Sequence, residues 1–229
     1  KTNCTVLHHP QLEADDLIAG WIQNHPDDQH VIVSTDSDFA QLIAPNVRQY
    51  NGVSGVTTTL EGYFDERGKP VIDKKTKLPK PAPNPNWLLF EKCMRGDTSD
   101  NIFSAYPGVR TKGTKNKVGL TEAFNDRDSK GYYWNNLQLQ RWVDHNGVEH
   151  RVIDDYNRNV TLIDLTAQPE NVKEIIKDTI NAVPKKNTPQ VGTHFLKFCG
   201  TYSLERASEQ ATVFGEIFSK SYQSIKEYA

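Results

Sequence analysis

Short apolar runs alternate with helical patterns over the first part of the chain, and this alternation predicts the fold class. Residues 4–7 and 47–50 are predicted strands, and the apolar run at 31–33 is typical of a strand buried on both faces of a parallel sheet. Apolar side chains at helical spacing predict helices over residues 11–23 and 39–43. Together these elements indicate an α/β fold with a mostly parallel central sheet flanked by helices.

The pattern changes after residue 56. Residues 56–60 form a predicted strand that pairs locally, and residues 79–85, which contain four prolines, form an extended connector. Asn146-Gly147 predicts the tight turn of a β-hairpin. We therefore expect one α/β domain over residues 1–85 and a helical C-terminal subdomain over residues 86–229. Its predicted helices cover residues 87–95 (beginning at Asn86 and ended by Gly96), 118–124, 154–165, 170–180 and, more loosely, 194–228.

Composition fits a globular protein and excludes several classes. The 229 residues are 36% hydrophobic and 24% charged, and the chain has no apolar run of the roughly 18 residues that a membrane span needs. No secretory signal pattern is visible. The three widely separated cysteines favour reduced thiols over disulfides or a zinc site. We expect a cytoplasmic protein with no membrane partner.

Positive charge is concentrated in two segments, although the net charge is −2. Residues 67–80 contain six bases and one acid, and residues 101–121 contain four bases and no acid. Basic segments beside acidic clusters fit phosphate-binding surfaces beside metal ions, and scattered solvated lysines are the alternative interpretation. The bases of the second segment are Arg110, Lys112, Lys115 and Lys117.

Three groups of acidic residues are the candidate chemical centre. The first opens the helix predicted over residues 11–23, the second follows the strand at 31–33, and the third follows the helix at 87–95. Mg²⁺ prefers hard oxygen ligands, and a pair of such ions in a small volume can hydrolyse a phosphodiester. The carboxylates of the three groups are Glu13, Asp15, Asp16, Asp36, Asp38, Asp97 and Asp100.

Each group alone also has an ordinary structural explanation. Carboxylates in the first turn of a helix complement its dipole, and Asp15 points about 100° away from its neighbour Asp16. Asp36 and Asp38 equally suit a polar turn or a single-metal loop, as in phosphatases. The segment at 96–101 equally suits a capped turn. Trp134 and Trp142 could stack on bases, but hairpin or core packing is the favoured interpretation.

The three groups in this order resemble successive motifs of the 5′ nuclease (flap endonuclease) family. Pro107-Gly108-Val109 resembles the turn of the family's helix–hairpin–helix element. Residues 156–165 are similar to the corresponding part of the phage ribonuclease H type of 5′→3′ exonuclease. The resemblance covers most of residues 12–165 and implies a 5′ nuclease/PIN-like fold. The matching motifs are Glu13-Ala14-Asp15-Asp16, Ser34-Thr35-Asp36-Ser37-Asp38-Phe39 and Gly96-Asp97-Thr98-Ser99-Asp100-Asn101.

The resemblance also implies roles for individual residues. It implies two Mg²⁺ ions, with Mn²⁺ as a substitute, and a hairpin that contacts duplex phosphates and holds a monovalent cation. The first ion would take Glu13, Asp15, Asp16 and Asp36, the second Asp38, Asp97 and Asp100, with Asp15, Asp36 and Asp38 catalytic. The implied DNA-binding residues are Gly108, Arg110, Lys112, Gly113, Lys115 and Lys117.

The implied activity is metal-dependent 5′→3′ exonuclease and flap endonuclease action on DNA and RNA–DNA hybrids. It would remove primers or flaps in replication, beside a replication polymerase or a single-strand-binding protein, in the host cytoplasm if phage-encoded. The family's first aspartates and its basic helical arch have no counterpart after Lys1, so we expect a natural N-terminal portion ahead of it. Residues 1–85 would then be the C-terminal part of the nuclease domain, and residues 86–229 the DNA-binding subdomain.

Two alternatives remain open. A non-catalytic protein that binds DNA structures would keep the basic hairpin without a complete metal site. A phosphatase using Asp36 and Asp38 is weaker, because it does not explain the other acidic groups. The run after Pro107 is also longer than the family's compact glycine-rich turn, so we expect a longer or shifted hairpin.

Overall fold

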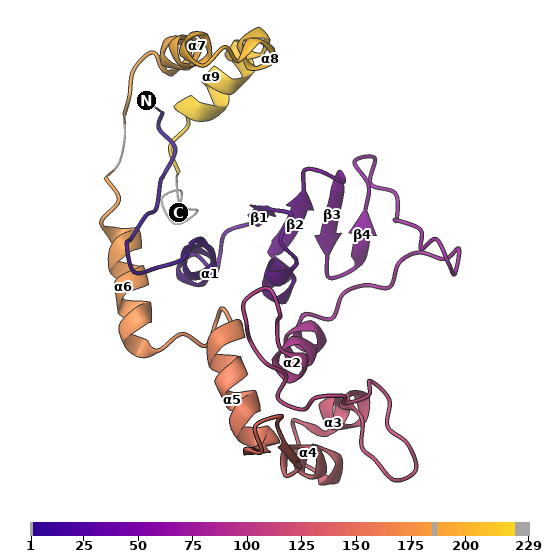
Figure 1. Ribbon diagram of the computed structural model, residues 1–229. Helices are drawn as coiled ribbons and strands as arrows, with labels where there is room; N and C mark the ends of the chain where they lie inside the picture. Colours follow the sequence, from indigo (N-terminus) through magenta and orange to yellow (C-terminus); the bar gives the residue numbers. More distant parts are fainter. Residues whose placement is uncertain (1, 185–186, 223–229) are drawn as a thin grey trace. The chain divides into compact units, whose positions relative to one another are not determined.

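The computed structural model describes residues 2–184 and 187–222, which form two compact units (Figure 1). The helical unit joins residues 1–28 to residues 171–229, and the sheet unit comprises residues 29–170. The expected division at residue 85 into a nuclease domain and a DNA-binding subdomain stays a prediction. Within the described ranges, no helix has the length and apolar character needed to cross a bilayer.

The sheet unit contains the described strands and most of the predicted site. Its elements, in chain order, are β1 (His30–Val33), η1 (Ser37–Leu42), β2 (Val47–Asn51), β3 (Val56–Thr59), β4 (Gly62–Phe64), α2 (Pro85–Arg95), α3 (Leu120–Asp126), α4 (Tyr132–Gln138), β5 (Arg141–Val143), β6 (Glu149–Arg151) and α5 (Val152–Ile163).

The main sheet has four strands in the order β1-β2-β3-β4 (Figure 1). β1 and β2 run parallel, with Ile32 opposite Gln49, while β2–β3 and β3–β4 are antiparallel. The α/β class is confirmed, and the sheet is mixed, with one parallel pair among its three. The cause is local: four residues separate β2 from β3 and two separate β3 from β4, and such short links join only antiparallel strands.

β1 is buried on one face only. His30 and Ile32 are buried, whereas Val31 and Val33 are 47% and 71% exposed. The prediction of a strand buried on both faces is therefore wrong. Its side chains alternate between the two faces, and only the face that bears Ile32 is covered.

The helices of the sheet unit share one hydrophobic core. Phe90 and Met94 of α2 pack with residues of α3, α4 and α5, and Trp134 packs against the same cluster. Trp142 donates its indole N–H to the carbonyl of Ala105 at 2.9 Å. Both tryptophans therefore serve packing, as predicted. The hairpin of β5 and β6 around Gly147 is also confirmed.

α2 has clear start and stop signals in its sequence. Asn84 caps it by accepting the N–H of Trp87 at 3.0 Å, two residues before the predicted Asn86, and Pro85 occupies the first turn. Gly96 ends the helix, as predicted, with φ of 75°. A Cβ at this position would collide with the carbonyl oxygen of Ile102, so only glycine fits between the helix and the loop that follows.

The described part of the helical unit contains two close helix contacts. In α1 Gly20 leaves room for the side chain of Ile176 from α6, and α7 meets α9 where Gly192 lies against Gly215. The predicted strand at 4–7 is wrong, since these residues form no ladder in the described chain. Asn3 instead hydrogen-bonds to Thr188 and Ser219. The elements are α1 (Ala14–Asn24), α6 (Glu170–Asn181), α7 (Val191–Thr201), α8 (Glu205–Glu209) and α9 (Ala211–Ser219).

Candidate metal centre

The loop after β1 is fixed in place by the neighbouring strand. Asp36 precedes η1, and its Oδ1 accepts the N–H of Asp38 at 2.9 Å. The buried Gln49 on β2 donates its amide to the carbonyls of Ser34 (3.1 Å) and Asp36 (2.6 Å). Phe39 is buried directly afterwards. These contacts hold the backbone on both sides of the half-buried Asp38, which lies in the first turn of η1.

The loop after α2 closes on itself. Asp97 and Ile102 exchange two backbone hydrogen bonds of 2.8 and 2.7 Å. The Asp97 carboxylate also accepts the backbone N–H of Ser99 at 2.9 Å and a bond from its hydroxyl. We call residues 97–102 the acidic loop. Its turn chemistry holds Asp97 half-buried and presents Asp100 on the exposed side.

The two loops bring three carboxylates together. Asp38, Asp97 and Asp100 each offer an oxygen within 4.8 Å of the others, and we call these residues the acidic cluster. The ammonium group of Lys92 on α2 contacts Asp38 Oδ1 and lies 2.6 Å from Asp97 Oδ2. A cation therefore already lies between two members of an all-oxygen donor set, and this set fits a hard divalent ion.

The close contacts in the acidic cluster shift the pKa values of Lys92, Asp97 and Asp100. Burial acts to lower the pKa of Lys92, but hydrogen bonds to Asp38 and Asp97 outweigh it and raise the pKa. The hydrogen bond from Lys92, followed by that from Ser99, lowers the pKa of Asp97 well below its usual range. Desolvation and the negative charge of Asp97 raise the pKa of Asp100. The positive charge of Lys92 acts to lower the pKa of Asp100, but desolvation and the charge of Asp97 outweigh it.

A fully buried asparagine supports the acidic loop from behind. Asn159 on α5 donates to the carbonyls of Cys93 and Phe103, both at 2.8 Å. Its oxygen accepts two bonds from the guanidinium of Arg158, at 3.2 and 3.0 Å. The side chain therefore ties the last turn of α2 to the segment directly after the acidic loop.

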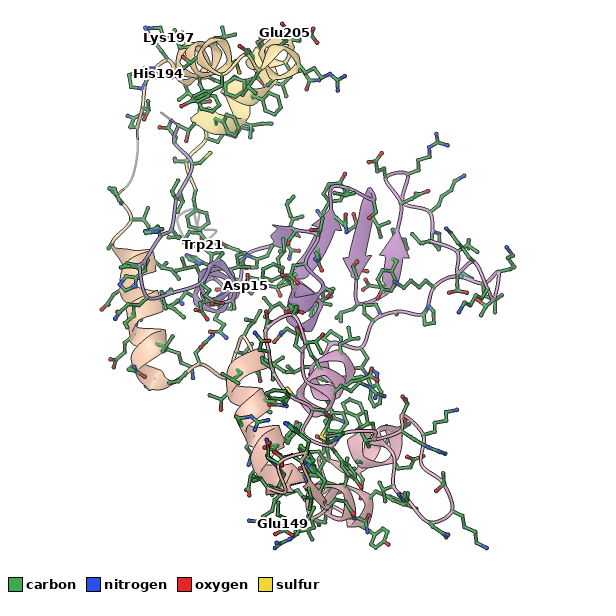
Figure 2. All side chains as sticks on the ribbon, viewed as in Figure 1. Asp15, Trp21, Glu149, His194, Lys197 and Glu205 are labelled. Atoms are coloured by element: carbon green, nitrogen blue, oxygen red, sulfur yellow. The ribbon has the colours of Figure 1, made fainter. Side chains whose placement is uncertain are left out.

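The remaining predicted ligands are not members of the acidic cluster. Asp36 is exposed and is not a member of the acidic cluster. Glu13, Asp15 and Asp16 lie at the start of α1 in the helical unit, where Figure 2 labels Asp15. Asp16 Oδ2 accepts the backbone N–H of Glu13 at 3.0 Å, as in a capping box. Participation of these four carboxylates in a metal site stays a prediction.

The predicted DNA-binding residues lie in the long loop that joins α2 to α3. We call residues 106–118 the hairpin loop. Glu122 fastens it by accepting the N–H groups of Gly113 (2.9 Å) and Gly119 (3.0 Å). A Cβ at Gly113 would lie 2.6 Å from the carbonyl of Lys117, so the two sides of the loop approach closely. The exposed bases are Arg110, Lys112, Lys115 and Lys117.

A cavity of about 600 Å³ lies between the hairpin loop and α4. Gly108, Arg110, Gly113 and Lys117 line it, together with Asn136 from α4. The hollow is thus surrounded by four of the six residues that the sequence predicts to bind DNA. Their role in binding stays a prediction.

Sequence reasoning missed four residues that organise the site. Glu122 had a local signal, because a glutamate three residues after a helix start is typical of a capping box. Lys92, Gln49 and Asn159 had none. Lys92 lies five residues before Asp97 but 54 after Asp38, and the partners of Gln49 and the two carbonyls bound by Asn159 lie 13 to 15 and 56 to 66 residues away in sequence. Such contacts become visible only once the chain is folded.

Comparison with known proteins gives distant sequence relatives, and no family model matches the chain. Ribonuclease H of Enterobacteria phage T4 is 24% identical over 206 residues, which cover 84% of this chain. DNA polymerase I of Rhizobium leguminosarum is 29% identical over 129 residues, and that of Treponema pallidum 30% over 140 residues. The matches cover 56% and 59% of this chain, respectively.

The chain corresponds to only part of each relative. It spans 56% of the T4 ribonuclease H and 11% and 12% of the two polymerases. Among solved structures, a mutant T5 5′-exonuclease is 20% identical, with a TM-score of 0.42 over 74% of this chain and 66% of its own.

Proposed function

We propose, on the premise that this chain belongs to the 5′ nuclease family, that it hydrolyses phosphodiester bonds with the help of divalent cations. The premise rests on the three acidic motifs and on the sequence relatives. The observation that carries the proposal is the acidic cluster. Its three carboxylates come from loops 59 residues apart in sequence, at Asp38 and Asp97, and still lie within 4.8 Å of one another.

The acidic cluster would hold one divalent cation through oxygen ligands. Mg²⁺ is the first candidate and Mn²⁺ its substitute, because both prefer carboxylate and water oxygens. Glu13, Asp15, Asp16 and Asp36 are the proposed ligands of a second ion, and Asp15, Asp36 and Asp38 the proposed catalytic carboxylates. Bound there, the ions would supply Lewis-acid stabilisation of the charge that develops on the phosphate.

The chain's own side chains prepare this site. Lys92 offsets the repulsion between the carboxylates of Asp38 and Asp97 by contacting both. Gln49 and Asn159 fix the backbones of the two loops and thereby the positions of the oxygens. A site whose ligands are already held in position loses little entropy when an ion binds.

The hairpin loop is the proposed grip on the substrate. Its exposed bases would bind phosphates of a duplex, and its backbone N–H groups would contribute further hydrogen bonds. The proposed substrates are duplex DNA with a 5′ end or flap and RNA–DNA hybrids, as for primer removal in replication. A monovalent cation at the hairpin loop, and a polymerase or single-strand-binding protein as partner, are parts of the same proposal.

Cleavage of a 5′-flap DNA labelled at its 5′ end tests the proposal. With enzyme in excess and Mg²⁺ present, we expect the native chain to cleave and Asp38→Asn to leave the DNA intact. Asp128→Asn is the matched control, because Asp128 is an aspartate whose side chain is 84% exposed outside the acidic cluster. We expect this control to cleave at the native rate.

Calorimetry with Mg²⁺ alone gives a readout that does not depend on cleavage. We expect the native chain and Asp128→Asn to bind the ion and Asp38→Asn to bind it more weakly. A native chain that binds flap DNA, takes up neither Mg²⁺ nor Mn²⁺ and does not cleave would contradict the proposed nuclease activity. It would support the non-catalytic DNA-binding alternative.

A further inference from the structure

A second basic segment lies between β4 and α2, and the proposed function leaves it without a role. Residues 65–80, which we call the basic arm, contain six bases and three acids in a chain of net charge −2. All six bases are exposed. In Figure 2, several side chains tipped with nitrogen point away from the ribbon beyond β4. The bases are Arg67, Lys69, Lys74, Lys75, Lys77 and Lys80.

Two of the three acids of the basic arm accept hydrogen bonds from its own turns, and the third, Glu66, accepts the hydroxyl of Tyr50 at 3.4 Å. Asp65 accepts the backbone N–H groups of Arg67 and Lys69 at 2.9 and 2.8 Å. Asp73 accepts those of Lys75 and Thr76 at 2.9 and 2.8 Å, and the bonds from Thr76 and Lys75 lower its pKa. In the described part of the chain, none of the six bases forms an ion pair. Their charges are therefore open to an external anion.

The basic arm is an ordered extension of the sheet. Val71 N–H bonds to the carbonyl of Tyr63 and Lys80 N–H to that of Val71, both at 2.8 Å. Asp73 N–H bonds to the carbonyl of Leu78 at 2.9 Å. The ammonium of Lys80 lies 3.7 Å from the centre of the Tyr63 ring. A backbone held in this way fixes the points from which the basic side chains extend, which lowers the ordering cost of binding.

Protection of a sheet edge is the competing explanation. β4 is the last strand of the sheet, and lysines and prolines beside an edge strand prevent pairing with another chain. That role needs charge of either sign, because a row of glutamates repels a neighbouring strand equally well. Binding of a polyanion needs positive charge. The sign of the charge therefore distinguishes the two explanations.

We propose that the basic arm binds the phosphate backbone of nucleic acid, as a contact separate from the hairpin loop. This inference rests on the proposed function, since it assigns the arm to the same substrate. The arm and the acidic cluster belong to one compact unit. Nucleic acid is favoured over an acidic protein because this unit already presents the four bases of the hairpin loop, and phosphates repeat along a duplex at regular spacing.

Charge reversal of two adjacent bases tests the inference. Lys74→Glu/Lys75→Glu keeps the turn, whose hydrogen bonds come from backbone N–H groups, and keeps charge beside the edge strand. Lys177→Glu/Lys197→Glu makes the same charge change on exposed helix positions of the helical unit. Melting curves of both variants should match that of the native chain, which shows that each has folded.

Binding of a blunt DNA duplex without divalent ions, measured over a range of salt concentrations, is the readout. For the arm variant we expect about tenfold weaker binding, and a slope of log affinity against log salt that is shallower by about 2. The control variant should keep the native slope. An arm variant with native affinity and slope would overturn the inference, whether or not the native chain cleaves.

Two further outcomes separate the inference from the proposed function. Arm-dependent duplex binding by a native chain that never cleaves would refute the nuclease and leave the inference standing. A polyglutamate peptide provides the last comparison. Arm-dependent binding of this peptide without arm-dependent binding of the duplex would identify an acidic protein as the partner and overturn the assignment to nucleic acid.

Discussion

The acids at the start of α1 and those of the acidic cluster are the same kind of residue in different surroundings. At α1, Asp16 accepts a hydrogen bond from the backbone N–H of Glu13 at 3.0 Å. In the cluster, Asp38 and Asp97 share the ammonium of Lys92, and Asp100 lies close to both. A neutral backbone group stabilises the first arrangement, whereas the second concentrates negative charge that a cation relieves. Crowding between distant loops therefore marks a candidate metal site better than the number of acids does.

The largest expected effect comes from removing a carboxylate of the cluster. Asp97→Asn should slow cleavage of flap DNA by roughly a thousandfold, because a metal ligand stabilises the transition state by several kcal/mol and each 1.4 kcal/mol is a factor of ten. Single-turnover rates at saturating Mg²⁺ measure this effect. A loss no larger than that of the matched Asp128→Asn control would show that Asp97 is no ligand.

The acids at α1 allow capping and metal binding to be separated. Asp16→Asn keeps an oxygen that accepts the Glu13 N–H. The free energy of unfolding, measured in urea, should therefore change by no more than about 0.5 kcal/mol. If Asp16 also serves the second ion, cleavage should fall at least tenfold, on the order of one lost ligand interaction. Asp16→Ala should lower both stability and cleavage. Native cleavage by Asp16→Asn would restrict this residue to capping.

The support behind the cluster should matter for stability. Asn159→Ala leaves the carbonyls of Cys93 and Phe103 without their donor, so we expect a loss of about 2–3 kcal/mol in the free energy of unfolding. Asn157→Ala changes an exposed asparagine on the same helix and should have little effect. Urea titration of the pair compares them. Equal midpoints for the two variants would contradict the structural role of Asn159.

Replacing the internal cation should have a smaller effect, and one that depends on metal. Lys92→Gln leaves the three carboxylates to repel one another. Without divalent ions we expect the free energy of unfolding to fall by only about 1 kcal/mol, because Lys92 and its two aspartate partners are partly exposed. Added Mg²⁺ should restore more stability to this variant than to the native chain. Melting temperatures with and without Mg²⁺ test this, with Lys177→Gln as control. A Mg²⁺ shift equal to that of the native chain would contradict the role of Lys92.

The smallest expected effect is a difference between the pKa values of Asp97 and Asp100 in the acidic cluster. Without divalent ions, carboxyl carbon NMR should show Asp97 titrating below 3.8 and Asp100 above it. Because the folded pKa of Asp97 is lowered, its stabilising contribution is present above 3.8 and is lost as the pH falls through the folded value. Asp100 has the opposite sign, since its ionisation opposes folding as the pH rises. The reverse order of midpoints would disprove the role assigned to Lys92.

Local chemistry made much of the fold predictable. Gly96 ends α2 and Gly147 turns the β5–β6 hairpin, because each adopts a positive φ, of 75° and 83°, that other residues rarely adopt. The prediction of a strand at 4–7 was wrong because strand formation depends on distant parts of the chain and not on local chemistry. A short apolar run becomes a strand only when a neighbouring strand offers hydrogen bonds, and here Asn3 hydrogen-bonds to distant backbone groups instead.

The candidate site was predictable only in its residue types. The motif resemblance selected Asp38, Asp97 and Asp100 before the structure brought their oxygens together. It did not select Lys92, because nothing in the sequence near α2 indicates that its ammonium reaches across to Asp38, 54 residues earlier. The exposure of Val31 and Val33 was equally hidden, since burial of a strand face depends on what the rest of the chain places over it.

The amide of Gln49 makes the position of the loop that bears Asp38 depend on the register of the sheet. Gln49 reaches Ser34 and Asp36 only while β2 keeps its parallel register with β1, in which Gln49 lies opposite Ile32. A slip of one residue would turn this side chain to the other face of the sheet and release the loop that bears Asp38. The position of the Asp38 carboxylate therefore depends on the pairing of β1 with β2, and a chain with these strands unpaired would lack this support for its proposed metal ligand.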